Sequence, residues 1–130
     1  MSFSDYLELK VLDHICGDGA YTSPTVYLGA STADPGDDGA ALAEPSGNGY
    51  ARVVTAAADW NAASAGAKTN ATALSFPVAS GSWGTITYLC LFDALTSGNL
   101  LASGALTVPK AITTDQILRF PAASVTVSLA

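Results

Sequence analysis

The chain has 130 residues, of which 49% are apolar and only 12% are charged, and its formal net charge is −6. Its five basic residues are scattered, so it lacks the basic patch of a nucleic-acid-binding protein, and its negative charge disfavours an anionic membrane. The length predicts one domain over residues 1–130, large enough to bury roughly two-thirds of its unfolded surface.

The first predicted element is a helix over about residues 4–16. Ser4 is a suitable N-cap, acidic residues occupy the first turns, and Gly17 can end the helix. Leu7, Val11 and Ile15 follow at i, i+4 and i+8 and form one apolar stripe. Because so short a helix does not persist alone, we expect this stripe to pack against a sheet or a neighbouring subunit.

Short strands bounded by Gly, Pro and Asn follow the helix. The pattern predicts an antiparallel β-sandwich, jelly-roll-like, with about seven strands and one N-terminal helix. Pro109 is expected to end one strand, because proline cannot donate to a sheet. The region 56–70 is expected to be irregular or a frayed strand pair. The seven strands are predicted at about residues 25–30, 50–55, 71–76, 82–93, 100–107, 116–120 and 124–129.

The run 82–93 is the clearest strand, with Gly98-Asn99 expected in the hairpin loop that follows it. Its second half is apolar at every position, so it must hide both faces between two layers, or between one layer and another subunit. Period two divides the strand into one face with Ile86, Tyr88, Cys90 and Phe92, and another with Thr85, Thr87, Leu89 and Leu91.

A long loop is predicted over about residues 31–48, and loops of this length tend to be functional or mobile. Asp34, Asp37 and Asp38 lie at its acidic centre and could offer oxygen ligands to calcium. Their spacing does not match the twelve-residue calcium loop, and its closing Glu is missing. A solvated acidic turn is the better interpretation, so we expect no metal and no cofactor.

The sequence offers few groups for catalysis. His14 is the single histidine and is interpreted as a capping or surface residue, so neither a triad nor a zinc site is expected. Cys16 and Cys90 lack a C-x-x-C spacing and are interpreted as buried apolar fillers, with a disulfide between them left open. Trp60 and Trp83 could stack sugars, although a Trp at a strand entrance is more often a core or interface anchor.

Two segments, Gly47-Asn48-Gly49-Tyr50-Ala51-Arg52 and Ser82-Trp83-Gly84-Thr85, are the most specific part of a resemblance that runs nearly end to end. The resemblance also includes the helix start Phe3–Glu8, the Asp34-Pro35-Gly36 turn and Phe120-Pro121-Ala122. The chain resembles small bacteriophage virion structural proteins commonly labelled phage tail-fibre proteins. This resemblance implies a virion component without enzymatic activity. The N-terminal residues alternate charged and apolar types and do not resemble a signal peptide, so we expect synthesis in the host bacterial cytoplasm.

The tail-fibre label does not settle where on the virion the chain lies, because the chain is compact and has no long repetitive shaft. Those features favour a capsid decoration (cement) protein, a compact, acidic β domain that binds the capsid lattice as a homotrimer and contacts the major capsid protein. The alternative is a tail-fibre or baseplate-associated module that contributes to host-surface contact; a small carbohydrate-active enzyme is the weakest hypothesis. The candidate contact residues are Leu7, Val11, Ile15, Asp34 and Trp83.

Overall fold

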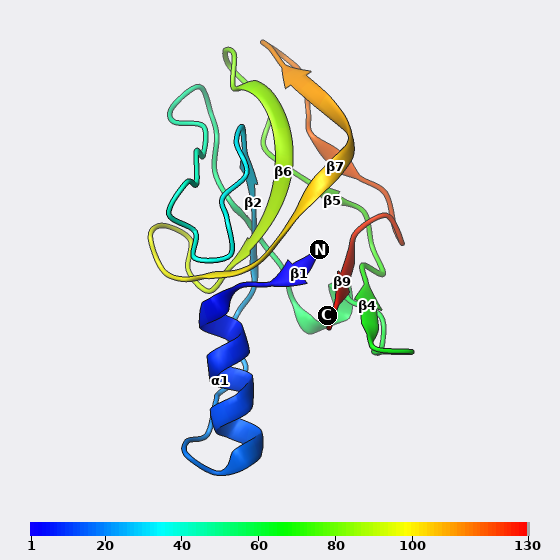
Figure 1. Ribbon diagram of the computed structural model, residues 1–130. Helices are drawn as coiled ribbons and strands as arrows, with labels where there is room; N and C mark the ends of the chain where they lie inside the picture. The colour runs from blue at the N-terminus through cyan, green and yellow to red at the C-terminus, as the bar shows by residue number, and fades with distance from the viewer. Residues whose placement is uncertain (130) are drawn as a thin grey trace.

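A five-stranded antiparallel sheet forms the body of the protein in the computed structural model, which describes residues 1–129 (Figure 1). Two further pairs of short antiparallel strands complete the β structure. The sheet order is β1 (Ser2–Phe3), β7 (Leu100–Ile112), β6 (Gly84–Phe92), β2 (Tyr27–Ser31) and β3 (Val53–Val54). The two pairs are β4 (Ala67–Thr69) with β9 (Thr126–Ser128), and β5 (Leu74–Ser75) with β8 (Arg119–Phe120).

The predicted class, mainly β and antiparallel with one N-terminal helix, is confirmed, while the jelly-roll-like detail stays a prediction. The strand β7 differs from its prediction, because it continues through Pro109 to Ile112. Ile86 pairs with Lys110 but Tyr88 pairs with Ala105, so the residues between 105 and 110 bulge out of the ladder. Pro109 lies in this bulge, where its missing N–H breaks no hydrogen bond of the sheet.

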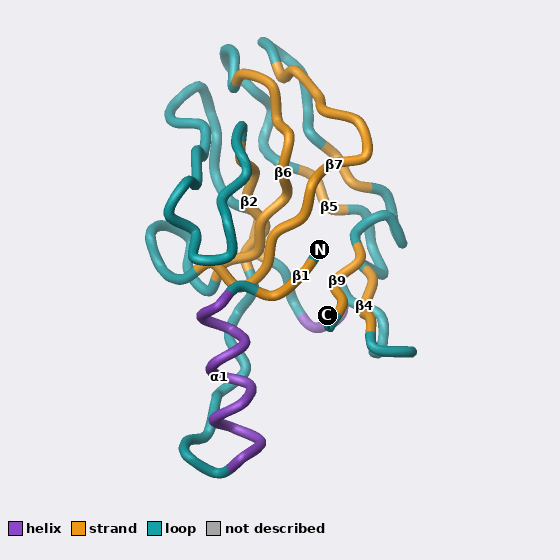
Figure 2. The backbone as a smooth tube through the Cα atoms, in the orientation of Figure 1, coloured by secondary structure: helices purple, strands orange, loops and turns teal. Residues whose placement is uncertain are grey.

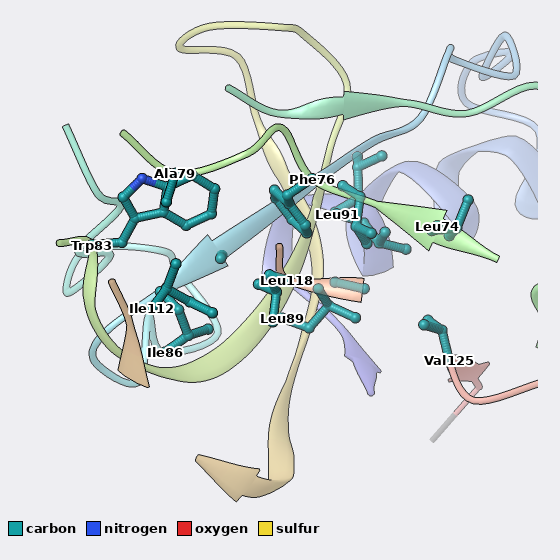
Figure 3. Packing of buried hydrophobic residues seen from close by; sticks show 14 residues of the cluster. Leu74, Phe76, Ala79, Trp83, Ile86, Leu89, Leu91, Ile112, Leu118 and Val125 are labelled. Carbon is teal, nitrogen blue, oxygen red and sulfur yellow. The ribbon is translucent and has the colours of Figure 1, made fainter. Parts of the chain in front are cut away.

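One face of the sheet packs against the two short ladders and their loops (Figure 3). Leu89 and Leu91 of β6 share one buried cluster with Leu74 of β5 and with Phe76 on this side. Ile86 belongs to the same cluster, whereas Tyr88 packs with Cys90 and Phe92. The predicted face of β6 that joined Ile86 to Tyr88 is therefore wrong, because the register irregularity between them interrupts the period-two alternation.

The opposite face of the sheet is covered by the long loop between β2 and β3. Cys90, Phe92 and Leu100 form a second buried cluster, and Leu42 of the loop packs against it. A Cβ added at Gly39 of the loop would lie 3.4 Å from a Leu100 methyl carbon, so the loop backbone runs close to the sheet. The second half of β6 is buried on both faces, as predicted, and the loop supplies one of the two layers.

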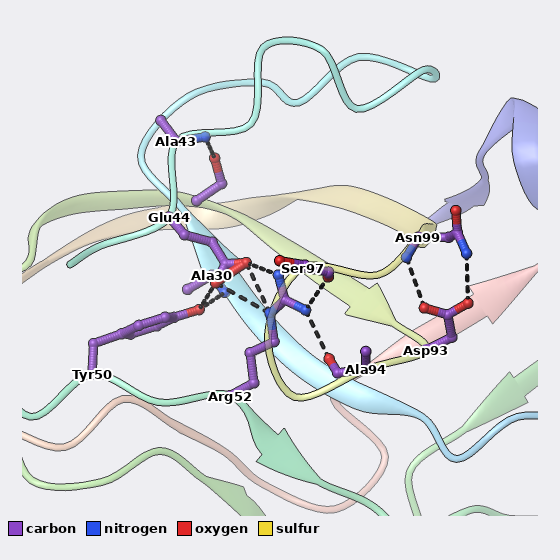
Figure 4. A network of polar contacts seen from close by, with 10 residues as sticks. Ala30, Ala43, Glu44, Tyr50, Arg52, Asp93, Ala94, Ser97 and Asn99 are labelled. Atoms are coloured by element: carbon purple, nitrogen blue, oxygen red, sulfur yellow. Dashed lines mark hydrogen bonds and ion pairs between the residues drawn. The ribbon is translucent and has the colours of Figure 1, made fainter.

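The long loop is fastened to the sheet by a largely buried ion pair between Arg52 and Glu44 (Figure 4). The Arg52 guanidinium also donates to the carbonyls of Ala94 and Ser97, at 2.7 and 2.8 Å, and stacks 3.5 Å from the Phe92 ring centroid. Tyr50 donates from its hydroxyl to Glu44 at 3.1 Å. The predicted loop is therefore a structural layer held by a charged network.

The helix α1 (Asp5–Cys16) projects away from the sheet, and the chain returns beside it to β2 (Figures 1 and 2). The Ser4 hydroxyl accepts from the Leu7 N–H, and Gly17 ends the helix at φ 93°, so both predicted caps are confirmed. A second, 3-10 helix η1 (Ala57–Asp59) precedes β4. Neither helix in residues 1–129 has the length and apolar character that crossing a bilayer requires.

Candidate partner-binding surface

An open apolar groove of about 710 Å³ lies where α1 joins the body. Leu7 and Val11 of α1 line one side, and Val26 of the returning segment continues the lining. Trp60 and Val127 line the part contributed by the body. We name this surface the α1 groove. Its lining brings together residues from both ends of the chain and from its middle.

The α1 groove exists because the helix leaves the body at a fixed point. The Ser4 N–H donates to the Leu101 carbonyl at 2.8 Å, and the Ser4 hydroxyl donates to the Leu100 carbonyl. At the far end of the helix, His14 Nδ1 accepts from the Tyr21 N–H at 3.0 Å. These contacts hold the helix and its returning segment together as one projecting arm, with the groove at its base.

The polar atoms in the α1 groove are few. Trp60 donates from Nε1 to the Thr55 hydroxyl at 3.0 Å, so its indole edge is fixed and its remaining surface is apolar. The Tyr21 hydroxyl is buried without a hydrogen-bond partner among residues 1–129, and burial, with Tyr6 nearby, raises the pKa of Tyr21. Such a lining binds apolar surface and offers no paired acid and base for proton transfer.

The side of α1 that faces away from the groove is also apolar. Leu9 is 62% exposed, Leu12 58% and Ile15 72%. Cys16 continues this exposed side and is a free thiol. Isolated exposed apolar residues are ordinary, but Leu9 and Leu12 lie with Cys16 on one side of the helix and form a patch, whereas Ile15 lies nearer to Val11. We name Leu9, Leu12 and Cys16 the outer face of α1.

The predicted apolar stripe of the helix is divided in the structure. Leu7 and Val11 are half-buried and line the α1 groove. Ile15, at the end of the helix, does not line it and is largely exposed. Two of the three stripe residues therefore meet in one candidate site, and the third lies at the tip of the arm.

Asp34 lies away from the α1 groove, in the long loop. Its carboxylate accepts from the Gly36 N–H at 2.9 Å and from the Tyr88 hydroxyl at 3.0 Å. The bond to Asp34 raises the pKa of Tyr88. Asp38 similarly accepts from the Ala40 N–H at 2.9 Å, which is the behaviour of an acidic turn. No cluster of three or more His, Cys, Asp or Glu side chains that could hold a metal ion occurs within residues 1–129.

Trp83 is a core residue, which corrects the expectation that it contacts a partner. Its side chain is 4% exposed and belongs to the buried cluster (Figure 3). Its ring meets Tyr50 edge-on at 5.2 Å between centroids. Its indole Nε1 donates to the Asn48 carbonyl at 2.9 Å. A bulky aromatic ring with its single polar atom satisfied inside the chain has no surface left to offer.

The two cysteines have different environments and are not paired. Cys90 is fully buried, as expected of an apolar filler, and burial raises the pKa of its thiol to about 12. Cys16 is exposed at the end of α1, so the expectation that it fills a core is wrong. The reason is that α1 projects from the body, which leaves its last turn without a layer to pack against.

The sequence interpretation missed the outer face of α1 and the part of the groove formed by residues 56–68. The spacing of Leu9, Leu12 and Cys16, at i, i+3 and i+7, repeats on one side of a helix and could have revealed the second apolar face. Trp60 and Lys68 of the groove come from a segment without regular periodicity. No local pattern placed them beside the helix.

The two most specific segments of the resemblance contact one another. Asn48 accepts from the Trp83 indole through its carbonyl and donates through Nδ2 to the Ser82 carbonyl at 2.9 Å. A Cβ at Gly81 would lie 2.7 Å from the Asn48 side chain, so the close approach requires glycine. Both segments therefore build the body of the fold.

The comparison with protein families gives a match over residues 2–128, to the family described as Podophage GP4 fiber I protein gp80. The chain belongs to this family. It is a structural protein of a phage virion, and the resemblance to phage tail-fibre proteins is confirmed. The match includes α1 and every strand of the described chain. No curated protein sequence matches the chain.

Proposed function

We propose that the protein is a fibre component of the phage virion that acts by binding other virion chains through the arm formed by α1. The observation that carries this proposal is the pair of apolar surfaces on α1, the groove on one side and the exposed outer face on the other. In a member of a fibre family, such surfaces fit a subunit that is covered when the particle assembles.

The proposed mechanism is binding by buried area. Specific interfaces bury on the order of 1,200–2,000 Å² in total, and a repeated subunit multiplies each contact. The α1 groove offers apolar side chains and one exposed cation, Lys68, and no arrangement of acid, base and nucleophile. We therefore propose a structural and not an enzymatic role.

Capsid decoration is the second candidate location, favoured by the compact body and the absence of a repetitive sequence. The family description favours the fibre. Contact with a host glycan stays a prediction, and of the two tryptophans it now concerns Trp60 alone, because Trp83 is buried.

Immunogold electron microscopy of purified virions tests the location. With an antibody raised against this chain, we expect gold particles at the tail of intact virions. Particles that lack the gene serve as the control and should remain unlabelled. Gold spread over the capsid surface would overturn the fibre proposal and establish the decoration hypothesis instead.

A further inference from the structure

The helix α1 carries apolar residues on two opposite sides. Each residue advances about 100° around a helix, so Leu9 lies about 200° from both Leu7 and Val11. Leu7 and Val11 line the α1 groove, while Leu9 and Leu12 of the outer face are exposed. A surface helix normally has one apolar stripe that faces the core and polar residues on the opposite face. The body of the protein covers only one side of α1.

We propose that the outer face of α1 in one copy docks into the α1 groove of a neighbouring copy. The occupant of the groove is thus a second copy of this chain. This inference rests on the proposed function, since it names the partner of the same arm. It adds which surface of one copy meets which surface of the next.

Charge complementarity supports this pairing. Lys68 lines the groove and is exposed, and the ion pair found within residues 1–129 joins Arg52 to Glu44 and leaves Lys68 without a carboxylate. The outer face of α1 is flanked by Asp5 and Glu8, both exposed in the first turns of the helix. Docking brings acidic side chains of one copy toward the unpaired cation of the next.

The direct pairing of two outer faces is less favourable. The helix carries Asp5, Glu8 and Asp13 against Lys10, so two such helices meeting face to face bring like charges together. The α1 groove instead presents apolar side chains and a lysine. The groove therefore fits the outer face better than a second outer face does.

The pairing of two different surfaces has a consequence for assembly. An interface between unlike patches is heterologous, and repeating it closes a ring when the rotation between copies allows closure. Because the donor and acceptor surfaces lie on opposite sides of one helix, every copy can use both. The homotrimer predicted from the sequence is one such ring.

Size-exclusion chromatography with light scattering on the purified full chain tests the proposal with two variants. The first, Leu9→Gln with Leu12→Gln, removes the outer face and keeps good helix formers. The second, Ala63→Glu, places a carboxylate in the groove at an exposed lining residue. We expect the wild type to be oligomeric, and each variant alone to be monomeric with a dissociation constant raised at least about ten-fold.

An equimolar mixture of the two variants is the decisive sample. The intact outer face of the Ala63→Glu chain can enter the intact groove of the other chain, and no further contact is possible. We expect a dimer containing one chain of each kind. Such complementation arises only when the two surfaces are different and meet each other.

The control is Val108→Gln, at a residue of β7 that is 74% exposed and belongs to neither surface. It should form the wild-type oligomer, and circular dichroism should show that every variant is folded. Should the helix variant lose its helix, the charge reversals Glu8→Lys and Lys68→Glu replace it. Each reversal alone should weaken assembly, and the two together should restore it.

Three results would overturn the inference: a monomeric wild type at all concentrations, an oligomeric Ala63→Glu variant, or a mixture that stays monomeric. The second would show that assembly does not depend on the α1 groove. These results are distinct from failure of the proposed function. Gold label at the tail together with a monomeric protein would remove this inference and leave the fibre role standing.

Discussion

Leucine side chains are buried in the central strand of the body but exposed on the projecting arm. Leu89 and Leu91 of β6 are 4% and 5% exposed, whereas Leu9 and Leu12 of α1 are 62% and 58% exposed. In the body, each apolar face of the central strand finds a layer supplied by its own chain. In the arm, one apolar face does not. The difference supports the proposal that another chain covers the arm.

The polar groups show the same contrast. In the body, the Arg52 guanidinium has four partners, Glu44, Ala94, Ser97 and the Phe92 ring, of which the first three are labelled in Figure 4. The Trp83 indole reaches the Asn48 carbonyl. Near the arm, the Tyr21 hydroxyl is buried without a partner in the described part of the chain. Buried polar groups are normally satisfied within a finished fold. The unsatisfied group lies beside the surface that we assign to binding.

The largest loss of stability is expected from Trp83→Ala, which removes a core side chain of the body. Removing a buried ring with a satisfied indole N–H should lower the free energy of unfolding by about 3–5 kcal/mol. Urea denaturation followed by circular dichroism measures this loss. Trp83→Phe keeps most of the packing and should lose less. A change below about 1 kcal/mol for Trp83→Ala would contradict the assignment of Trp83 to the core.

A somewhat smaller effect is expected from Arg52→Met, which releases the long loop from the sheet. The Arg52 side chain is 6% exposed and that of Glu44 19%, so the substitution leaves a largely buried carboxylate without its cation. The loss in unfolding free energy should be about 3 kcal/mol. The double variant Arg52→Met with Glu44→Gln should recover part of it, because the remaining partner is then neutral. If the loss in the double variant equals the sum of the losses in Arg52→Met and Glu44→Gln alone, the two groups are not coupled.

Local features of the fold could be predicted from the sequence. The helix with its caps at Ser4 and Gly17 was predictable, because capping depends on residues within one turn. The burial of β6 on both faces followed from its apolar run, and Gly98 lies in the predicted hairpin with φ 70°. Each of these features is determined by residues that lie close together in the sequence.

Features that depend on distant residues could not be predicted. The bulge opposite Ile86 depends on how β7 pairs with β6, and the cover over Cys90 and Phe92 comes from a loop some fifty residues earlier in the chain. The α1 groove joins the helix to Trp60 and Val127. The candidate site was therefore predicted only in its helical part, Leu7 and Val11.

The smallest effect is expected from Leu12→Ala, and it sharpens the comparison between arm and body. The substitution is made in the Ala63→Glu background, where we expect monomers, so that only contacts within one chain count. Because Leu12 is 58% exposed and Ala is a good helix former, the free energy of unfolding should change by no more than about 0.5 kcal/mol. The matched variant Leu91→Ala, at a residue 5% exposed, should lose about 2–5 kcal/mol. Urea denaturation of the two variants measures both changes. A loss above about 2 kcal/mol for Leu12→Ala would mean that the outer face packs against its own body, and the arm would then need no partner to cover it.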